Sequence, residues 1–179
     1  IARLKIQYGT SLVYPPSTMG AHVSAIPNHQ TQRATDLAIR GNAAMSGLLG
    51  YELDLTQLTQ EEKAQIKEQI AFYKKHRRLL QLGRFVRLLS PYEGNDAAWL
   101  YVSPDKKEAI VFYFRVLAEA SAPLVTLKLA GLDPDLTYQS GGETFGGDEL
   151  MQLGLYIDPH LAGDYATQRF HFVAKAPHE

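Results

Sequence analysis

The sequence predicts an α/β segment followed by an all-β domain, with a change of character near Gly83. Before that glycine, the strongest periodic signal is a long amphipathic helix over residues 59–82. After it, short apolar runs are separated by turn residues, which is typical of antiparallel β-structure. The two predicted parts therefore span residues 1–83 and 84–179.

The helix predicted over residues 59–82 has an apolar face and marked ends. Its apolar positions recur at helical spacing, at Ile66, Ile70, Tyr73 and Leu80. Thr59 with Glu62 three residues later predicts a capping box. Basic residues suit the negative C-terminal end of the helix, and they are His76, Arg77 and Arg78. We interpret these charges as the solvated face of a well-capped helix.

The first fifty residues predict an alternating arrangement of helices and a strand. Ile1, Leu4 and Tyr8 have helical spacing, and residues 19–25 form a short, partly apolar run that Pro27 closes. A second helix is expected over Leu37–Met45, with Asp36 at its N-cap. These elements are too few to form a closed sheet by themselves. They are what the C-terminal end of an alternating α/β fold would contain.

Seven short β-type runs follow Gly83, at the spacing expected of an antiparallel sandwich. They cover residues 85–89, 97–102, 108–117, 124–129, 136–139, 153–157 and 169–173. Residues 103–107 and 131–135 contain Pro and Asp and predict two hairpin connections. The Gly-rich stretch 141–147 is interpreted as a loop between strands. A phosphate loop is disfavoured because no helix pattern opens there and the acidic Asp148 and Glu149 follow.

Composition excludes several classes of function. The 179 residues are 45% hydrophobic and 21% charged, with a formal net charge of −1, so no basic excess suits nucleic acid. Cysteine is absent, which is compatible with a reducing cytoplasm. No apolar run approaches the roughly 20 residues of a membrane-spanning helix. We expect a cytoplasmic protein with no nucleic-acid or membrane partner.

No motif in the sequence indicates a catalytic site. No pair of carboxylates has a pattern that identifies it as a glycosidase pair, and the acidic residues suit caps and turns. The histidines lack metal-ligand spacing, so we expect no metal site and no cofactor. The serines lack the context of a nucleophile elbow, and Trp99 lies in an apolar pattern typical of a core strand.

Several blocks of the sequence closely resemble consecutive blocks of bacterial α-galactosidases of glycoside hydrolase family 36. The blocks cover residues 6–15, 19–30, 40–47, 50–55, 113–117 and 147–151. The resemblance implies a retaining hydrolase that removes terminal α-D-galactosyl units from oligosaccharides such as raffinose and melibiose. It also implies that both catalytic aspartates lie upstream of Ile1, so we expect no catalytic residue in this chain and no activity from it alone.

The family layout assigns roles to the predicted elements. Residues 19–24 would be the last strand of a (β/α)8 TIM barrel, residues 25–35 a loop on its active-site face, and residues 59–82 a closing helix. Residues from Arg84 onward would form a C-terminal antiparallel β-sandwich domain. The residues nearest the sugar pocket would be His22, Ser24, Asn28 and His29. The family further suggests a homo-oligomer.

Two alternatives of another class remain for the β-domain. A noncatalytic carbohydrate-binding module would expose aromatic side chains on one sheet face. A structural or oligomerising domain would instead expose apolar patches and have no affinity for sugar. Of the two alternatives, the sequence favours the structural role.

Overall fold

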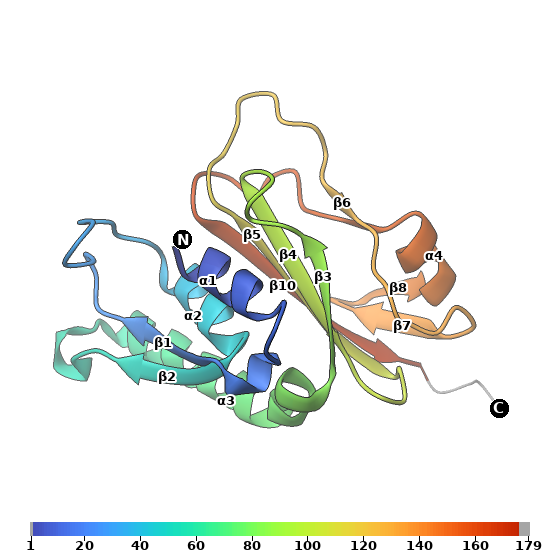
Figure 1. Ribbon diagram of the computed structural model, residues 1–179, viewed down its shortest axis with the longest axis horizontal. Coiled ribbons are helices and arrows are strands. Elements are labelled where there is room, and N and C mark those ends of the chain that lie inside the picture. Colours follow the sequence, from blue (N-terminus) through green and yellow to red (C-terminus); the bar gives the residue numbers. More distant parts are fainter. Residues whose placement is uncertain (1, 176–179) are drawn as a thin grey trace. The chain divides into compact units, whose positions relative to one another are not determined.

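The computed structural model describes residues 2–175, which form two compact units that divide between Gln81 and Leu82 (Figure 1). The elements of the first unit, in chain order, are α1 (Ala2–Thr10), η1 (Pro16–Thr18), β1 (Gly20–Ser24), α2 (Leu37–Met45), β2 (Leu48–Glu52), η2 (Leu55–Gln57) and α3 (Gln60–Leu82). The helix predicted over Leu37–Met45 is confirmed at both ends.

Strands β1 and β2 pair in parallel, with α2 as the crossover between them. Their register runs from Gly20 opposite Leu48 to Ser24 opposite Glu52. A parallel pair joined through a helix is the βαβ unit from which α/β barrels are built. The sequence predicted only one strand here, and the expectation that residues 19–24 form the last strand is wrong, because β2 follows β1 in the chain. Strand β2 was missed because Gly50 interrupts an already short apolar run.

Helices α2 and α3 cover one face of this parallel pair. Ala21 and Val23 of β1 are 3% and 0% exposed, and they pack in one hydrophobic cluster with Leu37, Ala44 and Ile66. Because successive side chains of a strand point to opposite faces, the residues between them lie on the other face of the pair. That other face carries Gly20, His22 and Ser24 from β1.

A buried amide joins the elements around α2. The Gln69 side chain on α3 donates to the Leu37 carbonyl at 3.1 Å and accepts from the Tyr51 hydroxyl of β2 at 2.8 Å. A side chain at Gly41 would clash with the same amide, so this glycine permits α2 and α3 to approach closely. His76 of α3 is buried as well, which corrects its assignment to the solvated face of that helix.

The predicted capping box at the start of α3 is confirmed. The Glu62 amide donates to Thr59 Oγ1 at 3.2 Å, and the Thr59 amide donates to Glu62 Oε2 at 2.9 Å. Asp36 occupies the predicted N-cap position of α2 but makes no side-chain capping hydrogen bond. The carbonyl of Leu37, the first residue of α2, accepts a hydrogen bond from the Gln69 side chain of α3.

The second unit is built on a six-stranded antiparallel sheet in the order β3-β4-β5-β10-β7-β8. Its strands are β3 (Arg84–Leu89), β4 (Asp96–Val102), β5 (Glu108–Arg115), β7 (Thr137–Ser140), β8 (Glu143–Gly146) and β10 (Ala166–Ala174). A second sheet pairs β6 (Thr126–Leu127) with β9 (Leu155–Tyr156), and α4 (Gly147–Gln152) precedes β9. The last strand in sequence, β10, lies between β5 and β7.

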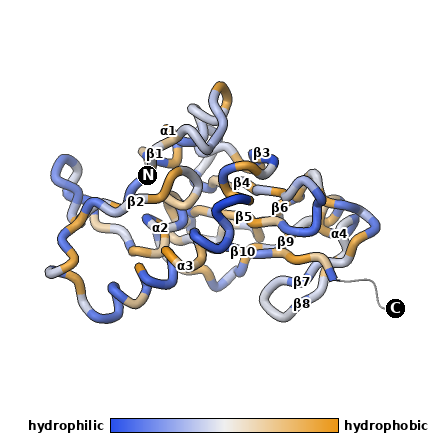
Figure 2. Tube along the Cα trace, turned by 90° about the horizontal axis from the view of Figure 1, so that it is seen from below, coloured by the Kyte–Doolittle hydropathy of each residue, from blue (hydrophilic) through white to orange (hydrophobic). Residues whose placement is uncertain are grey.

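A hydrophobic core lies against one face of the large sheet, and it confirms the predicted β-sandwich. Leu100, Val111 and Phe172 contribute from the six-stranded sheet, whereas Leu127 and Leu155 contribute from the small one. Hydrophobic residues recur along the strands of the large sheet, as Figure 2 shows. Trp99 is 1% exposed, and its ring centroid lies 4.8 Å from that of Phe114 with the two rings tilted at 42°, which confirms that it is a core residue.

One of the two predicted hairpins is wrong. The connection at 103–107 is confirmed, since β4 and β5 pair on either side of it. Residues 131–135, however, do not join a hairpin, because β6 pairs with β9 and β7 pairs with β8 and β10. Leu129 and Leu132 are both 3% exposed. The segment that contains them is therefore packed into the core where the chain passes from the small sheet to the large one.

The glycine-rich stretch also differs from the expectation. Gly141 and Gly142 turn the chain between β7 and β8, as expected of a loop, but α4 then opens at Gly147 although no helix was predicted there. Leu150 of α4 is fully buried, so tertiary packing stabilises this short helix. The Glu149 carboxylate accepts from the Gly146 amide at 3.0 Å, which places an acid at the helix start.

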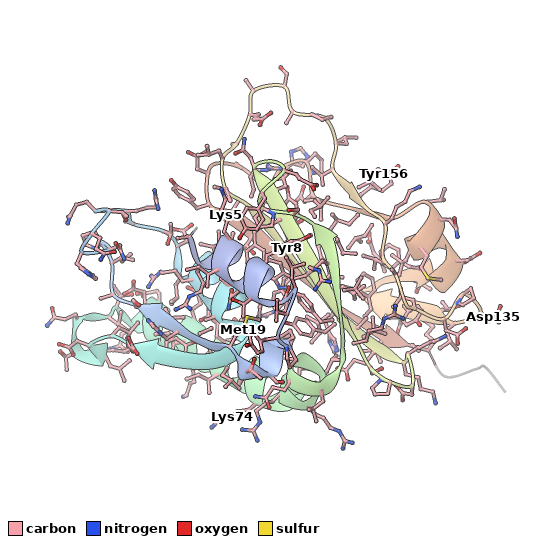
Figure 3. The ribbon with its side chains drawn as sticks, viewed as in Figure 1. Lys5, Tyr8, Met19, Lys74, Asp135 and Tyr156 are labelled. Atoms are coloured by element: carbon pink, nitrogen blue, oxygen red, sulfur yellow. The ribbon has the colours of Figure 1, made fainter. Side chains whose placement is uncertain are left out.

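Removal of the Thr59 cap is expected to destabilise the first unit. Thr59→Ala deletes the side-chain acceptor at the start of α3 and should lower the free energy of unfolding by about 1 kcal/mol. Urea unfolding of the intact protein that contains this chain measures the change. Lys74→Ala, an exposed substitution on the same helix (Figure 3), should change it by less than about 0.5 kcal/mol. Equal losses for the two variants would contradict the capping role.

The turn at Gly141 and Gly142 supplies a second stability test. Both glycines have positive φ, 60° and 88°, and open space surrounds each. Gly142→Ala should therefore cost about 1–2 kcal/mol through backbone strain alone. Gly94→Ala is the matched control, because Gly94 also faces open space but is not among the positive-φ residues. If the alanine at 142 is as harmless as the alanine at 94, the strain argument fails.

Candidate functional site

The candidate site lies at the carboxyl ends of β1 and β2. In α/β barrels the loops that follow the strands at this end carry the active site. Here the loop that follows β1 spans residues 25–36 and is named the β1–α2 loop (Figure 1). All four residues predicted to lie near the sugar belong to β1 or to this loop.

His22 is paired with a carboxylate of the neighbouring strand. Its Nε2 lies 3.1 Å from Oε2 of Glu52, and the two side chains are 34% and 70% exposed. Both residues lie on the face of the parallel pair opposite the helix-covered core, since His22 is opposite Gly50 and Ser24 is opposite Glu52. The pair therefore presents a polar, hydrogen-bonding group on that open face.

Ser24 takes part through its backbone. Its carbonyl accepts from Nη1 of Arg40 at 2.8 Å, and the Nε of the same guanidinium donates to the Thr35 carbonyl at 3.1 Å. Burial lowers the pKa of Arg40, whereas the nearby carboxylates of Glu62 and Asp36 oppose that effect. One half-buried arginine of α2 thus holds the chain at both ends of the β1–α2 loop.

Asn28 organises the interior of the loop. Its Oδ1 accepts from the Gln30 and Thr31 amides at 3.1 and 3.0 Å, and from the Thr31 hydroxyl at 3.2 Å. Its backbone amide donates to the Arg33 carbonyl at 2.9 Å, which closes the turn. His29 is exposed, and its carbonyl accepts from Gln32. The carbonyl oxygen of the Asn28 side chain therefore satisfies loop backbone, as polar groups at strand ends commonly do.

Sequence reasoning missed two residues of this site. Glu52 was counted only among the acidic residues that suit caps and turns, because β2 was not predicted. Arg40 lay within a block that supported the family resemblance but received no role. A signal was available for Glu52, because side chains two residues apart on a strand share a face. Glu52 lies two residues after Gly50, which is opposite His22, so Glu52 lies on the same face of the strand pair as His22. Arg40 offers no such signal, because its partners are backbone carbonyls.

The site offers few ligands for a metal ion. His22 and Glu52 are two metal-ligating groups within reach of one another, whereas zinc sites use at least three protein ligands. Among residues 2–175, no third His, Asp or Glu lies close enough to that pair to complete such a site. The geometry instead suits hydrogen bonding to a polar ligand.

A cavity lies in the β-domain but has few groups for a ligand. It has a volume of about 340 Å³ between the loops around residues 118–125 and 157–163. Its Arg115 already donates to the Leu161 carbonyl at 2.7 Å and to the Tyr113 hydroxyl at 3.2 Å. Within the described part of this domain, the exposed aromatic residues are Tyr92, which lies in a turn, and Tyr156, which lies on β9, so they do not form one stacking face.

Comparison with known proteins agrees with this arrangement of elements. The family model Melibiase matches residues 1–83, and the model of the glycosyl hydrolase family 36 C-terminal domain matches residues 96–172. The α-galactosidase AgaA of Geobacillus stearothermophilus is 57% identical over 175 residues, which are 97% of this chain and 24% of that relative. Alpha-galactosidase 1 of Pediococcus pentosaceus is 52% identical over 176 residues, again 97% of this chain and 24% of the relative.

Solved structures match equally well. The crystal structure of the family 36 α-galactosidase AgaB from Geobacillus stearothermophilus superposes with a TM-score of 0.94 at 59% identity, over 97% of this chain and 24% of that one. A crystal structure of an AgaA variant in complex with raffinose gives a TM-score of 0.94 at 56% identity, with the same coverage. The parallel βαβ unit and the β-sandwich therefore share the fold of the corresponding parts of these family 36 proteins.

The chain belongs to glycoside hydrolase family 36 and corresponds to the C-terminal part of its α-galactosidases. It spans about a quarter of the length of the curated relatives it matches, 24% for each of the two described above. Among the described residues, no helix has the length and apolarity needed to cross a membrane.

Alkaline pH is expected to weaken the link between β2 and α3. Burial raises the pKa of Tyr51 to about 12, above the ordinary value of about 10, because the neutral phenol is favoured in the folded state. Its contribution to stability is therefore complete below pH ~10 and is lost as the pH rises toward about 12. Urea unfolding of the intact protein between pH 7 and 11 should show this decline, and Tyr51→Phe should reduce it.

At neutral pH, the same variant should be less stable by about 1–3 kcal/mol, because Gln69 loses its donor. Tyr156→Phe is the control, since Tyr156 is 65% exposed on β9 and points away from the ribbon (Figure 3). It should match the parent at neutral pH. A Tyr51→Phe variant as stable as this control would contradict the proposed link.

Proposed function

We propose that this chain is the C-terminal portion of a retaining α-galactosidase that hydrolyses terminal α-D-galactosyl residues of oligosaccharides such as raffinose and melibiose. The observation that carries the proposal is the match over 97% of the chain to family 36 α-galactosidases, at 57% identity to AgaA. Crystal structures of AgaA variants contain raffinose or stachyose, which supports an oligosaccharide substrate for the intact protein.

In this proposal, the chain supports a site whose catalytic aspartates lie upstream. A retaining glycosidase needs two carboxylates about 5–5.5 Å apart, and the family places both outside this chain. The first unit contributes β1, β2 and the β1–α2 loop to the end of the barrel where substrate binds. His22, Ser24, Asn28 and His29 are the residues of this chain nearest the sugar.

The location and assembly of the intact protein are proposed from the same resemblance. We expect a cytoplasmic homo-oligomer, because the chain lacks cysteine and the family resemblance suggests assembly. The β-domain then has a structural role. A carbohydrate-binding role has less support, since the exposed Tyr92 and Tyr156 do not share a sheet face and Trp99 is buried.

Hydrolysis of a chromogenic substrate tests the proposal. The intact protein that contains this chain should release nitrophenol from nitrophenyl α-galactoside, and it should leave nitrophenyl β-galactoside intact as the anomeric control. A purified chain of residues 1–179, verified by mass, should release none, because it lacks the carboxylate pair. Hydrolysis by that chain alone, or an intact protein without α-galactosidase activity, would contradict the proposal.

A further inference from the structure

The β1–α2 loop is closed by a single side chain. The guanidinium of Arg40 donates to the Ser24 carbonyl, where β1 ends, and to the Thr35 carbonyl, just before α2 begins. These two carbonyls bracket the loop, so one rigid group fixes both of its ends. Hydrogen bonds from a charged donor are about twice as strong as neutral ones, which favours a lasting closure.

Arg40 is itself held in place by the fold. It lies on α2, whose first residue, Leu37, accepts through its carbonyl from the buried Gln69 amide. Its side chain is half-buried, with the carboxylates of Asp36 and Glu62 close enough to influence it. A lysine could not replace it, because an ammonium on a flexible stem lacks the planar fork that reaches two separate carbonyls.

Between its fixed ends, the loop is ordered locally and presents polar groups outward. Asn28 accepts three hydrogen bonds inside the loop, so its turn has a defined shape. The side chains of Asn28, His29 and Gln30 are exposed. The amide and imidazole groups of this loop are suited to hydrogen bonding with sugar hydroxyls.

We propose that Arg40 is a positioning residue for α-galactoside hydrolysis, which holds the β1–α2 loop in the shape that the oligosaccharide substrate meets. The inference rests on the proposed function. Arg40 does not touch the sugar in this account, because both of its described bonds go to loop backbone. Displacement of a binding loop by about 1 Å can cost as much as 100-fold in rate, so loss of the closure should be visible in kinetics.

The test uses the intact enzyme with raffinose as substrate. Arg40→Met should raise KM for raffinose and lower kcat/KM by about tenfold or more, with Arg40→Lys intermediate. Arg78→Met removes an exposed arginine of α3 and is the matched control, which should stay within twofold of the parent. A merely structural role would lower the amount of folded enzyme but leave its KM unchanged.

Two outcomes separate this inference from the proposed function. An inactive parent enzyme contradicts the proposed function itself. An active parent whose Arg40→Met and Arg40→Lys variants retain the parental KM and kcat/KM contradicts the role of Arg40 alone.

A measurement on the unmodified enzyme tests the premise that the β1–α2 loop meets the substrate, even if a variant fails to fold. Hydrogen exchange of the peptide that covers residues 25–36 should slow when raffinose is added. The α4 peptide in the β-domain is the internal reference and should not change. Equal exchange of the loop with and without raffinose would overturn the inference.

Discussion

The buried carboxamide of Gln69 is the interaction on which the first unit depends. It accepts from Tyr51 of β2 and donates to the Leu37 carbonyl, so one side chain of α3 links a strand to the start of the crossover helix. A buried amide left without partners would cost about 1–3 kcal/mol, which makes alternative placements of α2 unfavourable. Gly41 is needed because any side chain there would occupy the space of the amide.

From this link follows the shape of the candidate site. Fixing α2 fixes Arg40, and Arg40 in turn fixes the two ends of the β1–α2 loop. The alternation of β1 buries Ala21 and Val23 against the helices, and it leaves His22 and Ser24 on the opposite face. Packing on one face of the strand pair therefore determines which polar groups the other face presents.

Local signals in the sequence made much of the fold predictable, whereas strand pairings between distant residues could not be predicted from it. The capping box of α3 follows from the chemistry of adjacent residues, so the sequence contains it. The limits of α2 were predicted from its apolar pattern, although Asp36 makes no side-chain capping bond. The pairing of β6 with β9 accompanies the burial of Leu129 and Leu132 against residues that are distant in the sequence. Helix α4 depends in the same way on the burial of Leu150. In the candidate site, His22 and Ser24 were predicted through the family resemblance, whereas Arg40 received no role because its partners are backbone carbonyls that leave no trace in the sequence.

The most direct measurement of the central claim is a crystal structure of the intact protein, inactivated by substitution of its catalytic aspartates, with raffinose bound. The account predicts that the galactosyl unit lies on the face of β1 and β2 that carries His22 and Ser24, beside the carboxyl ends of these strands. It also predicts that Arg40 still bonds the Ser24 and Thr35 carbonyls. Raffinose bound at the amino ends of the strands, or a β1–α2 loop far from the sugar, would contradict the account.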